Sequence, residues 1–343
     1  SGRPIASGAA GFAVLDPSRV PAAAGTIYDL ASLTKPLVTS LLALILRREA
    51  GIDLGAPVRR FLPSFGSLDK REITLSHLLT HTSGLPAWAP LYVHGASIGE
   101  YLLRIGGMEP LAKPGGQVLY SDLGYIALGA ALERIGGGPL EVLAGELILA
   151  PAGVEACFRP GRELLGRVAA TEASCKYERG MAGSEAAGYT GWRTGVIRGE
   201  VHDQNAWAAG GVAGHAGLFG TAMDVLRLAR ELTGPEPTLL RDDDLPLALG
   251  IQTGSLPMPR SMAWRINRAA SGKPDPETAA GEALPATAAG HNGFTGTSVW
   301  TDPERERAYV LLTNRIHPEV RTRPDMNALR REFHRAAAAV PGS

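Results

Sequence analysis

The sequence is poor in cysteine and has no excess of either charge. Its 343 residues include two cysteines, Cys157 and Cys175, which could form one disulfide bond or none. Two cysteines cannot supply the framework of bridges that holds small secreted domains together. Lysine plus arginine and aspartate plus glutamate both number 34, so the formal net charge is zero. Proteins that bind nucleic acid usually carry a basic excess, and we therefore expect no nucleic-acid partner.

Long hydrophobic runs are also lacking. The longest extends from Leu37 to Leu46 and is interrupted by Thr39 and Ser40. About 20 apolar residues are needed to cross a bilayer, so we expect no membrane span. The first residues show no charged-then-apolar signal pattern. Either the protein is cytoplasmic, or it is periplasmic or extracellular and a signal was removed before residue 1. The sequence leaves this choice and the oligomeric state open.

The residues that are present are those of a folded protein. Hydrophobic residues make up 45% of the chain and charged residues 20%, which excludes wholesale disorder. The 43 glycines and 25 prolines predict many turns and long ordered loops. A chain of this length fits one large domain or two intertwined ones.

Periodicity and capping signals predict strands near both ends of the chain and helices between them. Expected strands are 9–15, 295–301 and 307–314, with weaker candidates at 247–254 and 261–266. Expected helices are 33–48, short ones opening at Thr74 and Ser97, 123–135, 139–149, 221–232 and 324–339. Residues 155–211 are expected to be loops with short strands. This order predicts an α+β fold with an antiparallel sheet flanked by helices. Residues 1–58 and 205–343 would form a discontinuous sheet domain, and 59–204 a mostly helical and loop insertion.

One candidate catalytic group opens the apolar helix. Ser32 and Lys35 are three residues apart, which places them on one helix face. Pro36 cannot donate to the carbonyl of Ser32, four residues earlier, and this missing bond does no harm only if Ser32 lies at the helix start. A hydroxyl would then lie at the positive end of the helix dipole, beside an amine and free backbone amides. Alone, however, the pattern also fits a helix cap followed by a surface lysine.

Two later groups are ambiguous when taken singly. Tyr120-Ser121-Asp122 directly precedes the helix expected at 123 and could be a plain helix cap. His291-Asn292-Gly293-Phe294 leads into the strand expected at 295–301 and could be a simple turn.

Together and in this order, the three groups resemble the motif set of the penicillin-recognising serine hydrolases. The chain is most similar to the branch that contains class C β-lactamases, serine D-Ala-D-Ala carboxypeptidases and β-lactamase-like esterases. The segments 28–35, 77–85, 201–206 and 210–219 also resemble stretches of that branch. The resemblance therefore covers most of the chain.

The resemblance implies a role for each residue. Ser32 would be the nucleophile that forms an acyl-enzyme, and Lys35 and Tyr120 would together manage its proton. The backbone amides of Ser32 and Phe294 would form the oxyanion hole. His291 would face the leaving group or carboxylate of the substrate. Either Lys35 or Tyr120 could be the general base, because burial lowers the pKa of a lysine and a nearby cation lowers that of a tyrosine.

The chain departs from the family pattern at three positions. Asp122 stands where many relatives have Asn, and a carboxylate there would hold Lys35 protonated. This favours the hypothesis that an anionic Tyr120 is the base. His291 replaces a lysine and is mostly neutral at pH 7, so strong β-lactamase activity is not expected. Asn292 stands where Thr is usual, and Gly293 completes the motif.

The expected function is hydrolysis of an ester or amide carbonyl in a small molecule or peptide. D-Ala-D-Ala carboxypeptidase or esterase activity ranks above weak β-lactamase activity. The alternative is a penicillin-binding sensor that is acylated but barely turns over. Candidate pocket residues are Trp88, Tyr92, Tyr189 and Trp192.

No metal or cofactor is expected. His77 and His81 share a helix face, but no glutamate lies between them as in metalloprotease motifs, so structural roles are favoured. His202, Asp203 and His215 could ligate a metal, and a network that braces loops is the favoured prediction.

Overall fold

The protein's computed structural model describes residues 4–234, 236–321 and 325–341. Its largest sheet has four antiparallel strands in the order β6–β7–β8–β9. These strands are Arg265–Ile266, Ala289–Asn292, Ser298–Asp302 and Arg307–Leu311. A three-stranded sheet joins β3 (Tyr28–Asp29), β5 (Leu218–Gly220) and β4 (Cys157–Phe158), and a small ribbon pairs β1 (Phe12–Val14) with β2 (Val20–Pro21). Antiparallel sheets combined with helices confirm the predicted α+β class.

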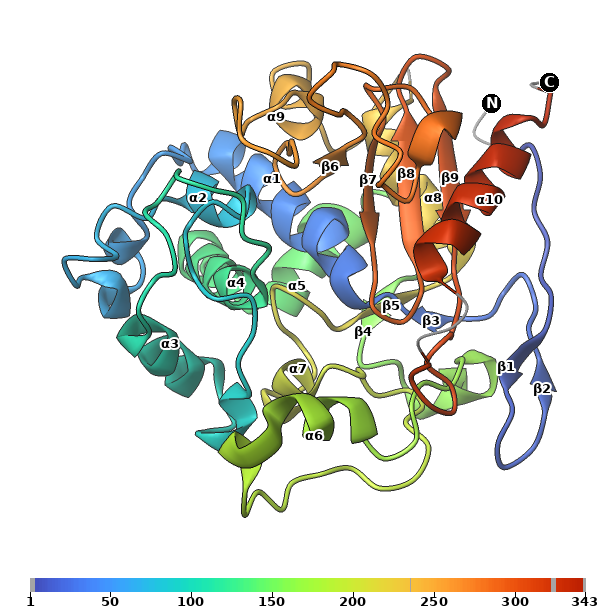
Figure 1. The fold of residues 1–343 in the computed structure, drawn as a ribbon, viewed down its shortest axis with the longest axis horizontal. Coiled ribbons are helices and arrows are strands. Elements are labelled where there is room, and N and C mark those ends of the chain that lie inside the picture. Colours follow the sequence, from blue (N-terminus) through green and yellow to red (C-terminus); the bar gives the residue numbers. More distant parts are fainter. Residues whose placement is uncertain (1–3, 235, 322–324, 342–343) are drawn as a thin grey trace.

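Helices cover both faces of the four-stranded sheet. Helix α8 (Ala222–Ala229) lies behind it in Figure 1 and α10 (Met326–Ala338) in front. Neighbouring residues of β8 point to opposite faces, as the pleat of a strand requires. Val299 belongs to the main core together with Val225 of α8, whereas Trp300 packs with Phe333 of α10.

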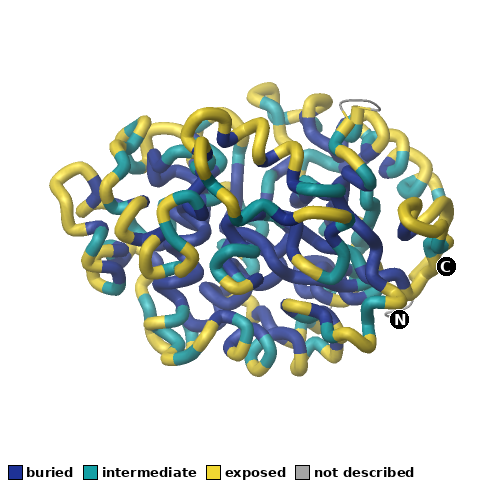
Figure 2. The backbone as a smooth tube through the Cα atoms, turned by 90° about the horizontal axis from the view of Figure 1, so that it is seen from below, coloured by how far each residue is buried: buried dark blue, intermediate teal, exposed yellow. Residues whose placement is uncertain are grey.

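Further helices pack beside the sheet around one hydrophobic core. They are α1 (Leu41–Glu49), α2 (Leu75–Leu79), α3 (Ile98–Gly107), α4 (Asp122–Gly136) and α5 (Leu140–Ala144). A single cluster of buried side chains includes Leu42 of α1, Leu128 of α4 and Val299 of β8. Figure 2 shows this buried backbone through the middle of the molecule, with exposed segments around it. The division into domains at 58/59 and 204/205 stays a prediction.

The first long helix begins as predicted but with irregular turns. A 3-10 turn spans Ala31–Leu33, a π-helical turn spans Lys35–Ser40, and α1 follows. Pro36 lies in the π turn and has no amide proton, which removes one regular α-helical bond at this point. The helix therefore places Ser32 in its first turn, where backbone amides lack helical partners.

Several local predictions were wrong or incomplete. Residues 247–254 are not a strand, because α9 (Leu245–Leu249) occupies the first half, with Pro246 in its first turn. Only Arg265–Ile266 of 261–266 is a strand. The region 155–211 also contains two helices, α6 (Lys176–Ala182) and α7 (Gln204–Ala208). Residue 324 of the expected last helix lies outside the described residues. No helix among the described residues is long and apolar enough to span a bilayer.

The His291 segment is also different from the prediction. His291 lies on strand β7, which pairs with β6 on one side and β8 on the other, and is not part of a turn. The turn comes afterwards, and β8 begins at Ser298 rather than at residue 295. Gly296, with φ of +102°, adopts the left-handed backbone that ends any extended run there.

Candidate active site

Ser32 follows a sharp turn out of strand β3. Ala31, directly before it, has a φ of +48°, which side-chain-bearing residues rarely adopt. The buried Asp29 carboxylate stabilises this turn, because Oδ1 accepts from the Ala31 amide at 2.8 Å and Oδ2 from the His202 amide at 2.7 Å. The turn leaves the Ser32 side chain partly exposed at the start of the helix.

Lys35 is fully buried, and its ammonium group has three oxygen partners. Nζ donates to Ser32 Oγ at 3.0 Å and to the His215 carbonyl at 3.1 Å, and it lies 2.7 Å from Asp122 Oδ1. Burial alone would lower the pKa of Lys35, but the charge of Asp122 and the contact with Tyr120 outweigh it. The net pKa lies above its usual value, so Lys35 is a cation at neutral pH.

Tyr120 joins this group from the segment before α4. Its ring centroid lies 5.0 Å from Lys35 Nζ. Burial raises the pKa of Tyr120 and Asp122 raises it further, while polar contacts with Lys35 and Ser32 act in the opposite direction. The net pKa is raised, so the phenol is protonated in the resting enzyme. The expected anionic Tyr120 is therefore not the resting state, because burial and the charge of Asp122 both raise the pKa of the phenol.

His291 reaches the same site from β7. Its ring centroid lies 5.9 Å from that of Tyr120, and its Nδ1 lies 3.0 Å from the Asn292 carbonyl. A carbonyl only accepts, so Nδ1 carries the proton and Nε2 is left as an acceptor. Burial, followed by the charges of Lys35 and Arg260, sets the pKa of His291 well below its usual value. This edge of the site therefore offers a neutral imidazole.

The turn after β7 is held against the segment that carries Ser32. Thr295 Oγ1 donates to the Asp29 carbonyl at 2.8 Å, and Thr297 Oγ1 donates to the Leu30 carbonyl at 3.2 Å. Gly293 permits this approach, because a Cβ there would lie 2.1 Å from Thr297 Oγ1 and 2.8 Å from the Leu30 carbonyl oxygen. Phe294 lies within this turn, and its ring contacts those of Tyr177 and His202.

The arrangement thus brings Ser32, Lys35, Tyr120, Asp122 and His291 to one place from three segments of the chain. A family model described as Beta-lactamase matches residues 1–332. The chain belongs to the beta-lactamase family.

Curated relatives of this beta-lactamase-family protein are named as carboxypeptidases. One from Salmonella agona and one from Salmonella typhimurium, each named "Putative D-alanyl-D-alanine carboxypeptidase", are 31% identical over 319 residues. These alignments cover 87% of this chain and 72% of the relatives. Together with the family model, they identify the chain as a serine hydrolase.

Solved structures confirm the fold. "EstCE1, a hydrolase with promiscuous acyltransferase activity" superposes with a TM-score of 0.72 at 22% identity and covers 97% of this chain and 90% of that one. "Beta-lactamase/D-alanine Carboxypeptidase from Yersinia pestis complexed with citrate" superposes with a TM-score of 0.65 at 19% identity, covering 94% and 86%. At these identities the likeness concerns the architecture.

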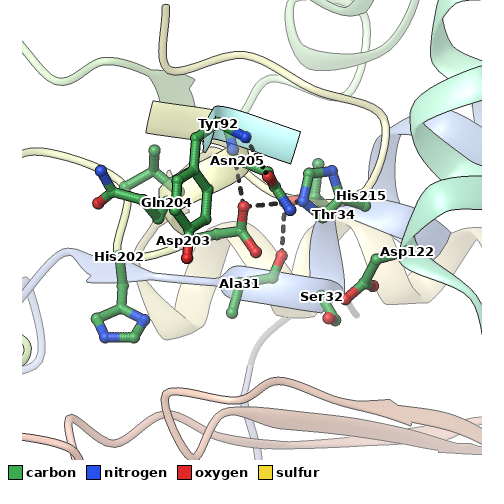
Figure 3. Close-up of polar contacts among 12 residues, drawn as sticks. Ala31, Ser32, Thr34, Tyr92, Asp122, His202, Asp203, Gln204, Asn205 and His215 are labelled. Atoms are coloured by element: carbon green, nitrogen blue, oxygen red, sulfur yellow. Dashed lines mark hydrogen bonds and ion pairs between the residues drawn. The ribbon is translucent and has the colours of Figure 1, made fainter. Parts of the chain in front are cut away.

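Two histidines of the family-like loop brace it, as predicted. His215 Nε2 lies 2.9 Å from Asp203 Oδ1, and His202 Nε2 lies 3.0 Å from Glu172 Oε2. Figure 3 shows Asp203 and His215 close to Thr34 in the upper part of the view, and Ser32 and Asp122 next to each other below them. Because the His215 carbonyl accepts from Lys35, this loop also contributes to the site.

The four predicted pocket aromatics form one cluster. Tyr92 and Tyr189 have ring centroids 5.1 Å apart, Tyr92 and Trp192 5.5 Å, and Tyr189 and Trp192 5.0 Å, and Trp88 packs against the same group. Tyr92 is buried at its centre. The structure therefore brings these residues together, and their contact with a substrate stays a prediction.

At the site, the sequence analysis missed Arg260 and named His81 only for a structural role. Arg260 is buried, and its Cζ lies 5.5 Å from the centroid of the Tyr120 ring. His81 packs against the same ring, at 4.4 Å between centroids. Arg260 gives no sequence signal, because only the fold brings it to this place. His81 lies within the family-like segment 77–85, which could have directed attention to it.

Proposed function

We propose that Ser32 is the nucleophile of a hydrolase that passes through an acyl-enzyme. Its Oγ would bond to the carbonyl carbon of an ester or amide and lose its proton to a base. The C–O or C–N bond would then break, and the leaving group would take up a proton. Water would release the acid and regenerate Ser32. The observation that carries this proposal is the contact of Ser32 Oγ with Lys35 Nζ, beside Tyr120 and Asp122.

Tyr120 is the group we assign to remove the proton from Ser32. Lys35 is a cation whose ammonium donates to oxygen atoms, and a protonated amine has no lone pair to accept a further proton. Tyr120 contacts both Ser32 and Lys35, and the lysine charge favours its ionised form. The reactive form would be the fraction of enzyme in which the coupled cluster has lost one proton. Lys35 would stay a cation and stabilise the phenolate.

The oxyanion would be stabilised by the backbone amides of Ser32 and Phe294. The hydrogen bonds of the turn begin at Leu33, whose amide donates to the Leu30 carbonyl at 3.0 Å. The Ser32 amide comes directly before this first bond. The Thr295 and Thr297 hydrogen bonds support this role, because they hold the Phe294 turn against the Ser32 segment. Two fixed amides aimed at one oxygen are the usual requirement for this kind of stabilisation.

For the substrate, we propose a peptide that ends in D-Ala-D-Ala, with an ester as the second candidate. The carboxypeptidase names of the relatives favour the first. Arg260 supports it as well, because its buried Nε has no hydrogen-bond partner among the described residues and its Nη1 donates only to the Ala263 carbonyl, at 3.3 Å. Burial lowers the pKa of Arg260 to about 10, so it is still charged at neutral pH. A substrate carboxylate would pair with the charged Arg260. The neutral His291 cannot supply this attraction.

Intact mass after incubation with a labelled penicillin or fluorophosphonate tests the nucleophile. The wild type should gain one label and Ser32→Ala none, while Ser184→Ala, which changes an exposed serine, should label like the wild type. Labelling of Ser32→Ala would contradict the assignment.

Turnover needs a separate measurement. Release of D-alanine from a D-Ala-D-Ala peptide, or of alcohol from an ester, should continue well beyond one equivalent. A burst of one equivalent without further release from either substrate would contradict hydrolysis and favour a sensor that is only acylated.

A further inference from the structure

His81 is a buried histidine with an unusual backbone conformation. It follows helix α2, has a φ of +57° and is almost completely buried. A left-handed backbone is costly for a residue with a side chain, and such strain persists only where the surroundings impose it. Neither Ser32 nor Lys35 is among its hydrogen-bond partners, so the proposed chemistry leaves this residue without a role.

The backbone and side chain of His81 hold the two amides that flank Tyr120. The His81 carbonyl accepts from the Leu119 amide at 2.8 Å, and His81 Nδ1 accepts from the Ser121 amide at 3.0 Å. The left-handed conformation allows one residue to present both acceptors to the same segment. Since an amide only donates, Nδ1 has the lone pair and Nε2 carries the proton.

The His81 ring also packs between two tyrosine rings. Its centroid lies 4.4 Å from that of Tyr120 and 4.8 Å from that of Tyr125, with a tilt of 31° in each case. Tyr125 is itself fixed, because its hydroxyl donates to the Leu79 carbonyl at 2.9 Å. The ring of His81 therefore rests on a rigid support and limits where the Tyr120 ring can lie.

We infer that His81 is a positioning residue that holds Tyr120 on both sides and beneath its ring, and so aims the phenol at Lys35 and Ser32. This inference rests on the proposed role of Tyr120. A displacement of about 1 Å in a catalytic group can cost two orders of magnitude in rate, so a group without direct contact with substrate can control kcat.

The hold of His81 on Tyr120, which we call the clamp, depends on a neutral imidazole that accepts from the Ser121 amide. A protonated ring would present an N–H group to the Ser121 amide and lose that hydrogen bond. The titratable groups that face the ring are the two tyrosines, Tyr120 and Tyr125, and the charged or basic groups are Arg260, Lys35 and His291. Burial, followed by these positive charges, keeps the pKa of His81 well below its usual value, so the clamp persists at neutral pH.

The variant His81→Asn tests the inference with little backbone strain. Asparagine tolerates the left-handed conformation and can still accept from the Ser121 amide, but it removes the ring beneath Tyr120. We expect kcat per labelled active site to fall about 10- to 100-fold with little change in KM. His81→Ala removes both features and should lose more. If the variant only contained less folded protein, and kcat per labelled active site were that of the wild type, the inference would be overturned.

His77→Asn is the matched control. His77 lies four residues earlier, and its Nδ1 likewise accepts from a backbone amide, that of Thr74, at 3.2 Å. The same substitution there removes an imidazole at the other end of α2 without touching Tyr120. It should leave kcat within about twofold of the wild type, whatever it does to thermal stability.

A double-mutant cycle with Tyr120→Phe separates this inference from the proposed function. If His81 acts through Tyr120, His81→Asn should have little further effect on acylation of Tyr120→Phe by a fluorophosphonate. Equal losses in both backgrounds would overturn the inference alone. A Tyr120→Phe variant with wild-type rates would instead contradict the proposed role of Tyr120.

Discussion

At the scale of single residues, the charge of Asp122 acts on the protonation of both Lys35 and Tyr120. Asp122 lies 2.7 Å from Lys35 and raises the pKa of both Lys35 and Tyr120. The sequence predicted the first effect, because a carboxylate next to an amine is visible in the motif. The second effect needed the fold, since it depends on how deeply Tyr120 is buried.

The variant Asp122→Asn should shift the pH dependence of kcat/KM. The active form has lost one proton from the cluster, so activity rises with pH through an apparent pKa. Asp122 raises that pKa, and its removal should lower it, which moves the acid limb to lower pH. Initial rates across pH 5–10 with a neutral ester measure the shift. An unchanged profile would remove the support for Asp122 as the group that sets this cluster.

Arg260→Met tests recognition of a carboxylate. A hydrogen bond to a charged group contributes about 1.5–3 kcal/mol, so KM for a peptide with a free terminal carboxylate should rise about 10- to 100-fold. An ester without a carboxylate should keep its KM. The exposed Arg162→Met is the control. Equal effects of Arg260→Met on both substrates would contradict a carboxylate site at this residue.

At the scale of elements, the predictions succeeded where pattern and packing agree. The apolar helix after Ser32 and the strands β8 and β9 were visible as hydrophobic runs. Strand β7 was missed, because Ala-Gly-His-Asn has no alternating pattern and is a strand only through its two neighbours. Residues 247–254 were wrongly predicted as a strand, because a short apolar run suits a helix equally well.

Gly293→Ala tests the close approach of the β7 turn to the Ser32 segment. The added Cβ would meet Thr297 Oγ1 and the Leu30 carbonyl, and overpacking of this kind costs about 1–3 kcal/mol. Both the melting temperature and kcat should fall, since the Phe294 amide moves with the turn. Gly180→Ala is the control, because a Cβ there meets nothing within 4 Å. Unchanged kcat in Gly293→Ala would contradict the role assigned to this turn.

At the scale of the whole molecule, long-range contacts decide what sequence reasoning can reach. Ser32 and Lys35 could be paired from their spacing alone. His81, Arg260 and the His215 carbonyl could not, because each reaches the site from a distant segment. The same kind of contact joins the first helix to the later part of the chain. Asp244 is fully buried and pairs with Arg47 at 3.0 Å and Arg48 at 2.6 Å.

Asp244→Asn should destabilise the protein without slowing catalysis. It leaves two arginines at the end of α1 without their buried partner, and loss of one member of such a pair costs about 3–5 kcal/mol when burial is complete. Because both arginines are partly exposed, we expect about 1–3 kcal/mol. Urea unfolding measures the loss. Asp243→Asn, which changes the exposed neighbour, should cost less than about 1 kcal/mol. Equal losses in the two variants would contradict this account.

The hydrogen bonds of Thr295 and Thr297 to the Ser32 segment have a consequence for the order in which the site is synthesised. They attach the turn after β7 to residues 29 and 30, so Ser32 leaves the ribosome more than 260 residues before the turn that lies against its segment. A nascent chain that has reached residue 280 contains the proposed nucleophile Ser32 but lacks Phe294, whose amide is the proposed second donor to the oxyanion. Under the roles proposed for Ser32 and Phe294, the pocket is complete only once the strands that follow residue 280 have docked.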